Sequence, residues 1–260
     1  MGFESLLVED TGALRVITIH RPQALNALSR QVVDELGRAL DEADANPALR
    51  VLALTGAGEK SFVAGADITE FSSLNPEEAR AYSAKGHGVL DRLATLRLPV
   101  VAAVNGFALG GGLELALAAD FIWASDNARL GLVETNLGII PGFGGVARLS
   151  RRVGKAMAAE MIFSAAQVKA DEALRIGLVN RVLPQAELLP EVKKLAETMA
   201  SKGPLALSAV KRLLREGEGA DLRTANAMEQ SAFGLVFSSA DAKEGVGAFT
   251  EKRKASFQGR

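Results

Sequence analysis

Three consecutive glycines, Gly110 to Gly112, constrain this chain of 260 residues more than any other feature of its sequence. They follow an apolar run at 100–104 and lead into a helix-forming run that carries one acid, Glu114. Glycine loses more backbone entropy on folding than any other residue, so no regular element needs three in a row for its own stability. Such a run suits a place where the backbone closely approaches a ligand and presents free N–H groups at a helix start.

The composition excludes several classes of protein and site. The chain has no cysteine, which excludes disulfides, thiolate catalysis and cysteine–metal sites. Its two histidines, His20 and His87, are too few for a histidine-rich metal site. The net charge of −1 gives no basic field that would attract nucleic acid or a membrane. No apolar run approaches the roughly 20 residues of a membrane-spanning helix, and the acidic N-terminal segment is not a secretory signal, so we expect a cytoplasmic protein.

Apolar periodicity predicts a large α/β core, which a chain of this length is able to bury. Strands are expected at 14–20, 50–54, 98–104, 120–124 and 178–183, and helices at 30–45, 76–96, 111–119, 154–163 and 170–177, with a loop at 55–61 and a short helix after Pro141. The segment 50–54 is apolar throughout, which is typical of a strand buried on both faces. Gly86 and Gly88 argue against an unbroken helix at 76–96.

The character of the sequence changes at Leu188, after which helices are expected at 188–201, 204–215, 221–236 and 240–254, with no strand. We therefore divide the chain into a core, 1–187, and a helical C-terminal region, 188–260, that drives trimerisation. The apolar residues of the last helices exceed what a small appendage can bury alone, and they predict a homotrimer or a dimer of trimers: Leu205, Leu207, Val210, Leu213, Leu214, Phe233, Leu235, Val236 and Phe237.

Two segments of the predicted core echo one another fifty residues apart. Residues 51–56 and 101–106 each have the pattern of a buried strand that ends in a polar residue and a glycine. Each is followed within ten residues by a second glycine-bearing segment, at 64–66 and at 110–112. Two such turns after neighbouring strands can aim two backbone N–H groups at one point, which is the arrangement of an oxyanion hole. The alternative is that these glycines only permit tight packing of strands against helices.

Two acids accompany the glycine-rich segments. Glu114 lies within a run of leucine and alanine that is too apolar for an exposed helix, and an acid buried there should be functional or paired. Glu134 follows twenty positions later, in a predicted loop after a strand. Two carboxyl groups around one water can hydrate an electron-poor double bond, because one takes a proton from the water and the other protonates the α-carbon. Such a pair titrates as a coupled unit.

Together these motifs resemble the crotonase family, the enoyl-CoA hydratase/isomerase superfamily, and within it enoyl-CoA hydratase or 3-hydroxybutyryl-CoA dehydratase most of all. The resemblance covers nearly the whole chain, through residues 21–28 (Arg-Pro-Gln-Ala-Leu-Asn-Ala-Leu), 62–68 (Phe-Val-Ala-Gly-Ala-Asp-Ile), 104–116, 131–145 and 251–253 (Glu-Lys-Arg). It implies an α/β fold built as a ClpP-like spiral of ββα units with a helical C-terminal region. It also implies assembly as a homotrimer or homohexamer.

The resemblance implies an acyl-CoA substrate, with the N–H groups of Ala66 and Gly111 as the oxyanion hole that stabilises an enolate. It places Glu114 and Glu134 as the catalytic acids, and we assign Glu114 as the base that activates water and Glu134 as the acid for the α-carbon. The implied reaction is the reversible hydration of trans-2-enoyl-CoA to 3-hydroxyacyl-CoA, which is typical of fatty acid β-oxidation. The alternatives are a Δ3,Δ2-enoyl-CoA isomerase, which needs only one acid, and a non-catalytic acyl-CoA-binding protein.

Further contacts with the substrate are implied in the same way. Lys60 and Ala64 are expected against the CoA nucleotide, and Phe249 and Lys252 are candidates to hold CoA across a subunit contact. The remaining predicted substrate-binding residues are Asp67, which resembles a structural cap, and Ile68, Gly110, Pro141, Gly142 and Phe143. Phe143 replaces the small residue that is common in this motif, which leaves the acyl-chain preference open. No metal or redox cofactor is implied, since CoA is part of the substrate, and the pathway stays open.

Overall fold

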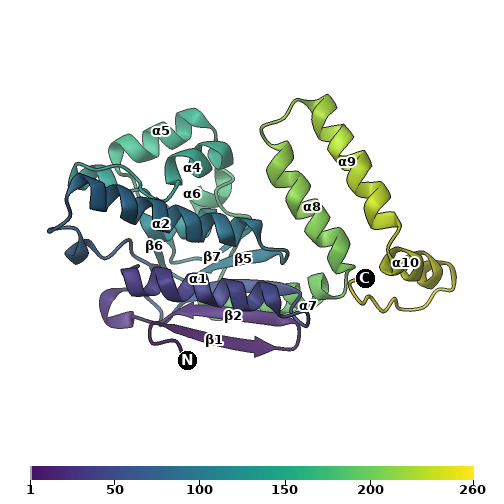
Figure 1. Cartoon of the computed structure of the whole chain (residues 1–260). Coiled ribbons are helices and arrows are strands. Elements are labelled where there is room, and N and C mark those ends of the chain that lie inside the picture. Colours follow the sequence, from purple (N-terminus) through teal and green to yellow (C-terminus); the bar gives the residue numbers. More distant parts are fainter. Residues whose placement is uncertain (1) are drawn as a thin grey trace.

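Strands in two sheets form the centre of the protein in the computed structural model, which describes residues 2–260 (Figure 1). The larger sheet contains β1 (Leu6–Thr11), β2 (Leu14–Ile19), β3 (Val51–Gly56), β5 (Val100–Val104), β7 (Phe121–Ser125) and β10 (Arg181–Leu183), in that spatial order. The smaller sheet contains β4 (Ser61–Val63), β6 (Phe107–Leu109), β8 (Arg129–Gly131) and β9 (Val168–Lys169), again in that order.

The helices that accompany the sheets are α1 (Arg30–Ala45), α2 (Pro76–Thr95), α3 (Gly111–Leu117), α4 (Gly145–Val153), α5 (Lys155–Ser164), α6 (Ala170–Arg175), α7 (Gln185–Ala200), α8 (Pro204–Gly217), α9 (Leu222–Phe237) and α10 (Ala240–Thr250). Short 3₁₀ helices are η1 (Pro22–Ala24), η2 (Ile68–Glu70) and η3 (Glu134–Leu137). Within residues 2–260, no helix is both long enough and apolar enough to cross a membrane.

The chain passes repeatedly from the larger sheet to the smaller one. Strands β3, β5 and β7 of the larger sheet lead into β4, β6 and β8 of the smaller sheet, and helices follow each pair. Within the larger sheet β3, β5 and β7 are parallel neighbours, and within the smaller sheet β4, β6 and β8 are parallel neighbours. Parallel neighbours require a crossover connection, whereas the pairs β1–β2 and β8–β9 are antiparallel. The predicted α/β spiral of ββα units is confirmed. The echo between residues 51–56 and 101–106 is the pairing of β3 with β5.

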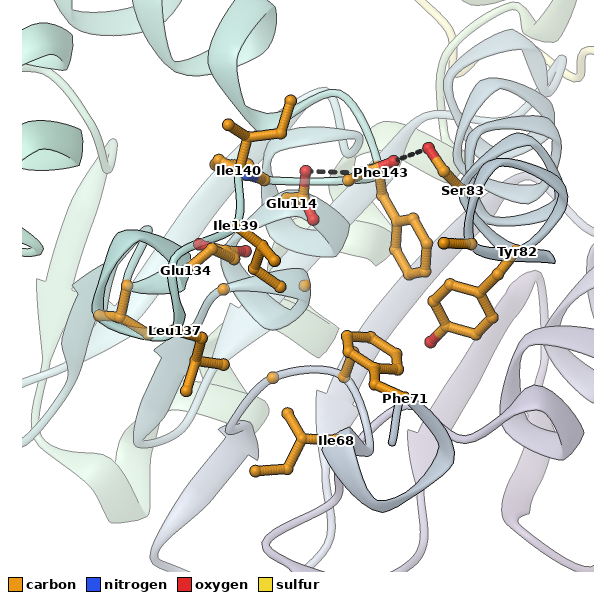
Figure 2. Close-up of a pocket in the computed structure, with 18 of the residues that line it drawn as sticks. Ile68, Phe71, Tyr82, Ser83, Glu114, Glu134, Leu137, Ile139, Ile140 and Phe143 are labelled. Atoms are coloured by element: carbon orange, nitrogen blue, oxygen red, sulfur yellow. Dashed lines mark hydrogen bonds between the residues drawn. The ribbon is translucent and has the colours of Figure 1, made fainter. Parts of the chain in front are cut away.

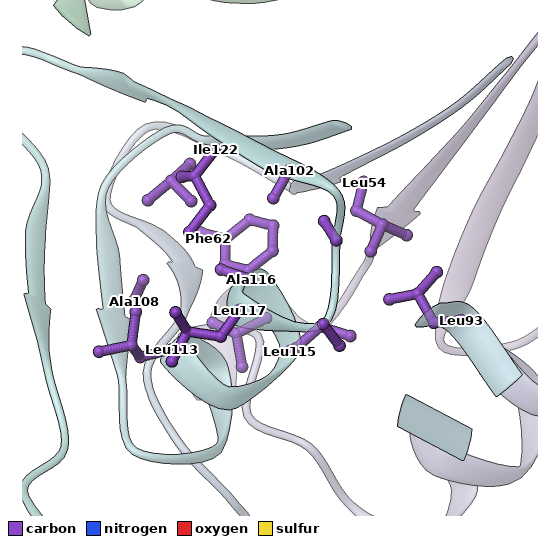
Figure 3. Packing of buried hydrophobic residues seen from close by; sticks show 14 of the residues in the cluster. Leu54, Phe62, Leu93, Ala102, Ala108, Leu113, Leu115, Ala116, Leu117 and Ile122 are labelled. Atoms are coloured by element: carbon purple, nitrogen blue, oxygen red, sulfur yellow. The ribbon is translucent and has the colours of Figure 1, made fainter. Parts of the chain in front are cut away.

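Strand β3 is buried on both faces, as its continuous apolar sequence predicts. Leu52 and Leu54 belong to the main core cluster, whereas Val51 and Ala53 belong to a second cluster under α7. Figure 3 shows the centre of the main cluster, where the fully buried Phe62 of β4 lies among the side chains of β5, α3 and β7. Consecutive residues of a strand face opposite sides, so both sides of the sheet need an apolar cover.

Gly112 allows α3 to pack closely against the smaller sheet. A Cβ atom at this position would lie 1.9 Å from the carbonyl oxygen of Val63 in β4. No side chain larger than hydrogen fits there, so one of the three glycines is required by packing alone. This supports the packing alternative for Gly112, and leaves Gly110 and Gly111 to be explained by the site.

The structure differs from the sequence expectations in its short strands and in one helix. Strands β1, β4, β6, β8 and β9 were not expected, because most contain only two or three residues and β1 is largely exposed. Part of β3 and the start of β4 occupy the predicted loop at 55–61. Helix α2 is unbroken despite two internal glycines, and it begins with a capping box in which Asn75 and Glu78 exchange side-chain to backbone hydrogen bonds.

The predicted domain boundary at residue 188 falls inside α7. This helix packs across the larger sheet, and Leu188, Val192 and Ala196 belong to the core cluster beneath it. Helices α8 and α9 pack on one another and stand away from the sheets, with α10 beyond them (Figure 1). By its packing, therefore, α7 belongs to the core, and the projecting helical region begins with α8.

An ion pair between the buried Lys211 and the partly exposed Asp120 ties α8 to the core. The Lys211 ammonium is 3.0 Å from the Asp120 carboxylate and donates to the carbonyl of Leu98 at 2.8 Å. Asp120 in turn accepts a hydrogen bond from the Val100 backbone N–H at 2.7 Å. Burial lowers the pKa of Lys211, and the Asp120 charge opposes this shift. Asp120 is therefore the main counter-charge that favours the ionised form of Lys211.

We predict that Asp120→Ala destabilises the protein by about 3 kcal/mol, because it leaves the Lys211 ammonium buried without its counter-charge. Lys211→Met should cost less, because it removes the charge that needs a partner. Urea unfolding of both variants measures the difference, with the exposed Asp126→Ala as control. Equal midpoints for Asp120→Ala and the control would contradict this account.

Candidate active site

A cavity of about 570 Å³ lies between α2, η3, the start of α3 and the segment 138–143 (Figure 2). Most of its lining is apolar: Ile68, Phe71, Leu74, Tyr82, Leu137, Ile139, Ile140 and Phe143. Glu114, Glu134, Ser83 and His87 are the main polar side chains along it. A mostly apolar cavity with a few convergent polar groups is the usual form of a small-molecule site.

Three neighbouring strands of the smaller sheet end at this cavity. Ala66 comes shortly after β4, Gly110 and Gly111 follow β6, and Glu134 comes shortly after β8. Because β4, β6 and β8 are parallel neighbours, their carboxyl ends lie at one edge of the sheet. The spiral therefore gathers three segments that are far apart in the sequence.

The backbone N–H groups of Ala66 and Gly111 lie next to each other. A Cβ atom on Gly111 would lie 3.4 Å from the Ala66 nitrogen. Gly111 opens α3, where the first N–H groups have no acceptor within the helix. Leu28 bonds to the residues on either side of Ala66, and no acceptor within residues 2–260 takes the N–H of Ala66 itself. Two free donors thus lie close together, as the sequence predicts.

Gly110 brings Glu134 against the start of α3. Its φ of +50° lies where side chains are disfavoured, and a Cβ atom there would be 2.9 Å from Glu134 Oε1. Glu134 opens η3 and lines the cavity. Burial, together with the charge of Glu114, raises the pKa of Glu134 to about 7, against the opposing effect of backbone N–H groups.

Glu134 also has an unsatisfied oxygen. Its Oε2 is the one side-chain nitrogen or oxygen that is buried without a hydrogen-bond partner in residues 2–260. Buried polar atoms in proteins nearly always have a partner, often an ordered water or a ligand. The unpartnered oxygen lies on a residue that lines the cavity, so its hydrogen-bonding capacity is available to a polar group there.

Glu114 is buried and oriented by two backbone donors. Its side chain extends from α3, the residue is 2% exposed, and Oε1 accepts hydrogen bonds from the N–H groups of Phe143 and Gly145, both at 2.7 Å. Burial raises the pKa of Glu114, and these two N–H groups oppose the shift. Both carboxyl groups of the site are therefore more basic than an ordinary glutamate, and the charge of Glu114 adds to the effect of burial on Glu134.

Most of the predicted site residues line this one cavity. These are Glu114, Glu134, Ala66, Gly111, Ala64, Ile68, Gly110, Pro141, Gly142 and Phe143. Lys60 lies outside it, as do Phe249, which is 86% exposed on α10, and Lys252 just beyond that helix. Their contact with CoA stays a prediction, and it would need a bound substrate or a second subunit.

Asp67 is bonded to neighbouring residues beside the cavity. Its carboxylate accepts a hydrogen bond from Arg21 at 3.0 Å and caps η2 through the Thr69 backbone N–H. Thr69 first, and then Arg21, hold the pKa of Asp67 below its usual range. Asp67 does not line the cavity and acts as the structural cap that the resemblance suggests, and its contact with the substrate stays a prediction.

Sequence reasoning missed the wall that α2 contributes. Ala79, Tyr82, Ser83 and His87 all line the cavity from this helix, together with Phe71 and Leu74 before it. Their spacing of three to four residues marks one helical face, but nothing in the spacing says whether that face covers core or a cavity. Among residues 2–260, no group of three histidine, aspartate or glutamate side chains is arranged to hold a metal ion.

The family model described as enoyl-CoA hydratase/isomerase matches residues 9–260. The chain belongs to the enoyl-CoA hydratase/isomerase family. A crotonyl-CoA hydratase from Syntrophomonas wolfei is 48% identical over 257 residues, which cover 99% of each chain. A short-chain-enoyl-CoA hydratase from Clostridium acetobutylicum is 48% identical over 254 residues, which cover 98% of this chain and 97% of that one.

Solved structures of the family have the same fold. The crystal structure of an enoyl-CoA hydratase from Bacillus anthracis matches with a TM-score of 0.96 at 39% identity, over 99% of this chain and all of that one. An enoyl-CoA hydratase from Geobacillus kaustophilus matches with a TM-score of 0.94 at 42% identity, over 99% of both chains. These matches confirm the family and the crotonase fold that the sequence motifs predict.

We predict that Glu114→Gln lowers the titration midpoint of Glu134, because it removes the charge that raises its pKa. The midpoint should fall below about 7 and stay above that of an ordinary glutamate, since burial is the larger cause. Isotope-edited infrared titration of the carboxyl bands measures this. Glu172→Gln, on the surface of α6, is the matched control, and an unchanged midpoint in Glu114→Gln would contradict the coupling.

Proposed function

We propose that this protein is an enoyl-CoA hydratase, a hydro-lyase that reversibly adds water to a trans-2-enoyl-CoA to give a 3-hydroxyacyl-CoA. The observation that carries the proposal is the pairing of two carboxyl groups of raised pKa with two adjacent free N–H groups around one cavity. Relatives named crotonyl-CoA hydratase and short-chain-enoyl-CoA hydratase, at 48% identity over nearly the whole chain, support it.

The two N–H groups serve the thioester oxygen of the substrate in this proposal. As water attacks C3, negative charge develops on that oxygen, and the N–H groups of Ala66 and Gly111 donate to it. Donors held in place by the fold need no reorganisation when the charge appears, and losing one costs roughly 10²–10³-fold in rate. Leu28 fixes the position of the Ala66 turn through backbone hydrogen bonds with the residues before and after Ala66.

The two glutamates move the protons. Glu114 takes a proton from water as the water oxygen bonds to C3, and Glu134 gives its proton to C2 as the enolate collapses. A pKa of about 7 keeps a substantial fraction of Glu134 protonated at neutral pH. The pair carries one proton throughout: Glu134 holds it before hydration, and Glu114 holds it before the reverse reaction. Coupled acid and base groups operate in this way.

The reaction in this form needs no metal or redox cofactor, because proton transfer and two amide donors supply its chemistry. CoA serves as the handle of the substrate. An enoyl-CoA isomerase remains the second candidate, and it shuttles a proton with one acid. The presence of both carboxyl groups on one cavity favours the hydratase over the isomerase and over a non-catalytic acyl-CoA-binding protein. The cytoplasmic location expected from the sequence stays a prediction.

We expect Glu114→Gln and Glu134→Gln each to lower kcat for hydration of crotonyl-CoA by about 10²–10⁴-fold, with a modest change in KM. Each amide keeps the shape of the side chain and removes its proton chemistry. Loss of absorbance at the enoyl-thioester band measures the rate, and Glu172→Gln serves as control. Wild-type turnover by Glu114→Gln would refute its role as the base, and no turnover by the unmodified protein would refute the hydratase.

We also infer that the protein assembles as a homotrimer or a dimer of trimers through its last helices. Phe233, Leu235 and Phe237 of α9 are 69%, 69% and 60% exposed, and Phe249 of α10 is 86% exposed. Large apolar side chains that are this exposed on neighbouring helices are typical of a subunit interface. Analytical ultracentrifugation at micromolar concentration should give three or six times the chain mass of 27.3 kDa, and a monomeric mass would contradict the inference.

A further inference from the structure

The turn that binds Glu114 is held on its other side by α2. The Ser83 hydroxyl of α2 donates to the Gly142 carbonyl at 2.6 Å, as Figure 2 shows. The Arg148 guanidinium donates to the Phe143 carbonyl at 2.7 Å and pairs with Asp91 of α2 at 2.6 Å. Each contact fixes a backbone carbonyl of the segment whose N–H groups bind Glu114.

The ring of Phe143 fills the space that a side chain at Gly86 would need. A Cβ atom on Gly86 would lie 2.2 Å from two ring carbons of Phe143, so any larger residue would move the ring. The ring is almost fully buried and packs on Tyr82, with centroids 5.3 Å apart. Glycine inside a helix costs about 1 kcal/mol relative to alanine, and here its absent side chain makes room for the ring.

These contacts form a short physical path from α2 to the carboxylate. Gly86 sets where the Phe143 ring lies, and Ser83 fixes the carbonyl just before it. The Phe143 N–H then donates to Glu114 Oε1. A displacement of the ring or of the Gly142 carbonyl therefore changes the distance and angle of a hydrogen bond to the carboxylate.

We propose that Ser83 and Gly86 are positioning residues for Glu114, and that they act through the Phe143 turn. This inference rests on the proposed function, in which Glu114 is the base. The helical pattern alone does not explain why a glycine stands at position 86. The proposal explains it by the position of the Phe143 ring and, through that ring, of Glu114.

The pH profile is the readout that a merely structural role would not move. The N–H groups of Gly145 and Phe143 lower the pKa of Glu114 against the effect of burial, so a looser turn raises that pKa. The acidic limb of kcat/KM then moves to higher pH, because the base is protonated earlier as pH falls. The other titratable groups near Glu114 are His87 and Tyr82 of α2, Arg148 of α4 and Glu134 of η3, and of these His87 and Arg148 lower its pKa.

The first test compares Gly86→Ala with Gly88→Ala. Both sit in the same helix, but a Cβ atom at Gly88 would meet no atom within 4 Å. Gly86→Ala should lower kcat on crotonyl-CoA by up to about 10²-fold and move the acidic limb up by about one pH unit, with little change in KM. Gly88→Ala should match the wild type, and equal behaviour of the two variants would overturn the proposal.

A double variant tests whether the ring transmits the effect. In the Phe143→Ala background the space above Gly86 is empty, so adding Gly86→Ala should change kcat by less than about twofold relative to Phe143→Ala alone. The same loss in both backgrounds would mean that Gly86 acts by another route and would overturn the proposal. This comparison remains decisive if Gly86→Ala alone lowers the melting temperature.

Ser83→Ala provides a test that does not depend on Gly86. It removes one hydroxyl at a half-buried position, so the chain should fold, and the acidic limb should again move to higher pH. An unmoved limb in Ser83→Ala would overturn the proposal. If Glu114→Gln is inactive while Ser83→Ala and Gly86→Ala keep the wild-type profile, this inference fails and the hydratase stands. If Glu114→Gln is fully active, the proposed function itself fails.

Discussion

The hydrogen bonds that the Phe143 and Gly145 N–H groups donate to Glu114 are the interaction on which the rest of the site depends. A carboxyl group with almost no exposure to water is costly unless it is bonded or protonated. Here burial favours the protonated form and two donors favour the ionised form, so the pKa of Glu114 is set by the balance of these opposing effects, with burial the larger. The turn, α3 and α2 must all be in place for that balance to exist.

The spiral of ββα units explains how three distant segments reach one point. Strands β4, β6 and β8 are short, but as parallel neighbours they deliver Ala66, Gly111 and Glu134 to the same edge of the smaller sheet. The larger sheet and the apolar clusters on its two faces then supply the stability that these three-residue strands lack on their own. Gly112 completes the arrangement, since its missing side chain lets α3 lie directly on β4.

Much of the site could be predicted from the sequence because its chemistry is unusual for its surroundings. An acid within an apolar helical run and a triple glycine have few structural explanations, so Glu114 and Gly111 stand out. The wall from α2 could not be predicted in this way. Ser83 and Gly86 have ordinary neighbours, and from the sequence Gly86 predicts a weakened helix, whereas in the structure its missing side chain makes room for the Phe143 ring.

The sequence by itself determined the family, the α/β class, the longer elements and the two carboxyl groups, because periodicity and rare local patterns are properties of the chain alone. Only the tertiary structure decided which short segments become strands, that α7 belongs to the core, and that Asp67 caps η2 away from the cavity. These depend on pairing and packing between residues far apart in the chain. No local pattern specifies such contacts, since each partner acquires its role only when the other is in place.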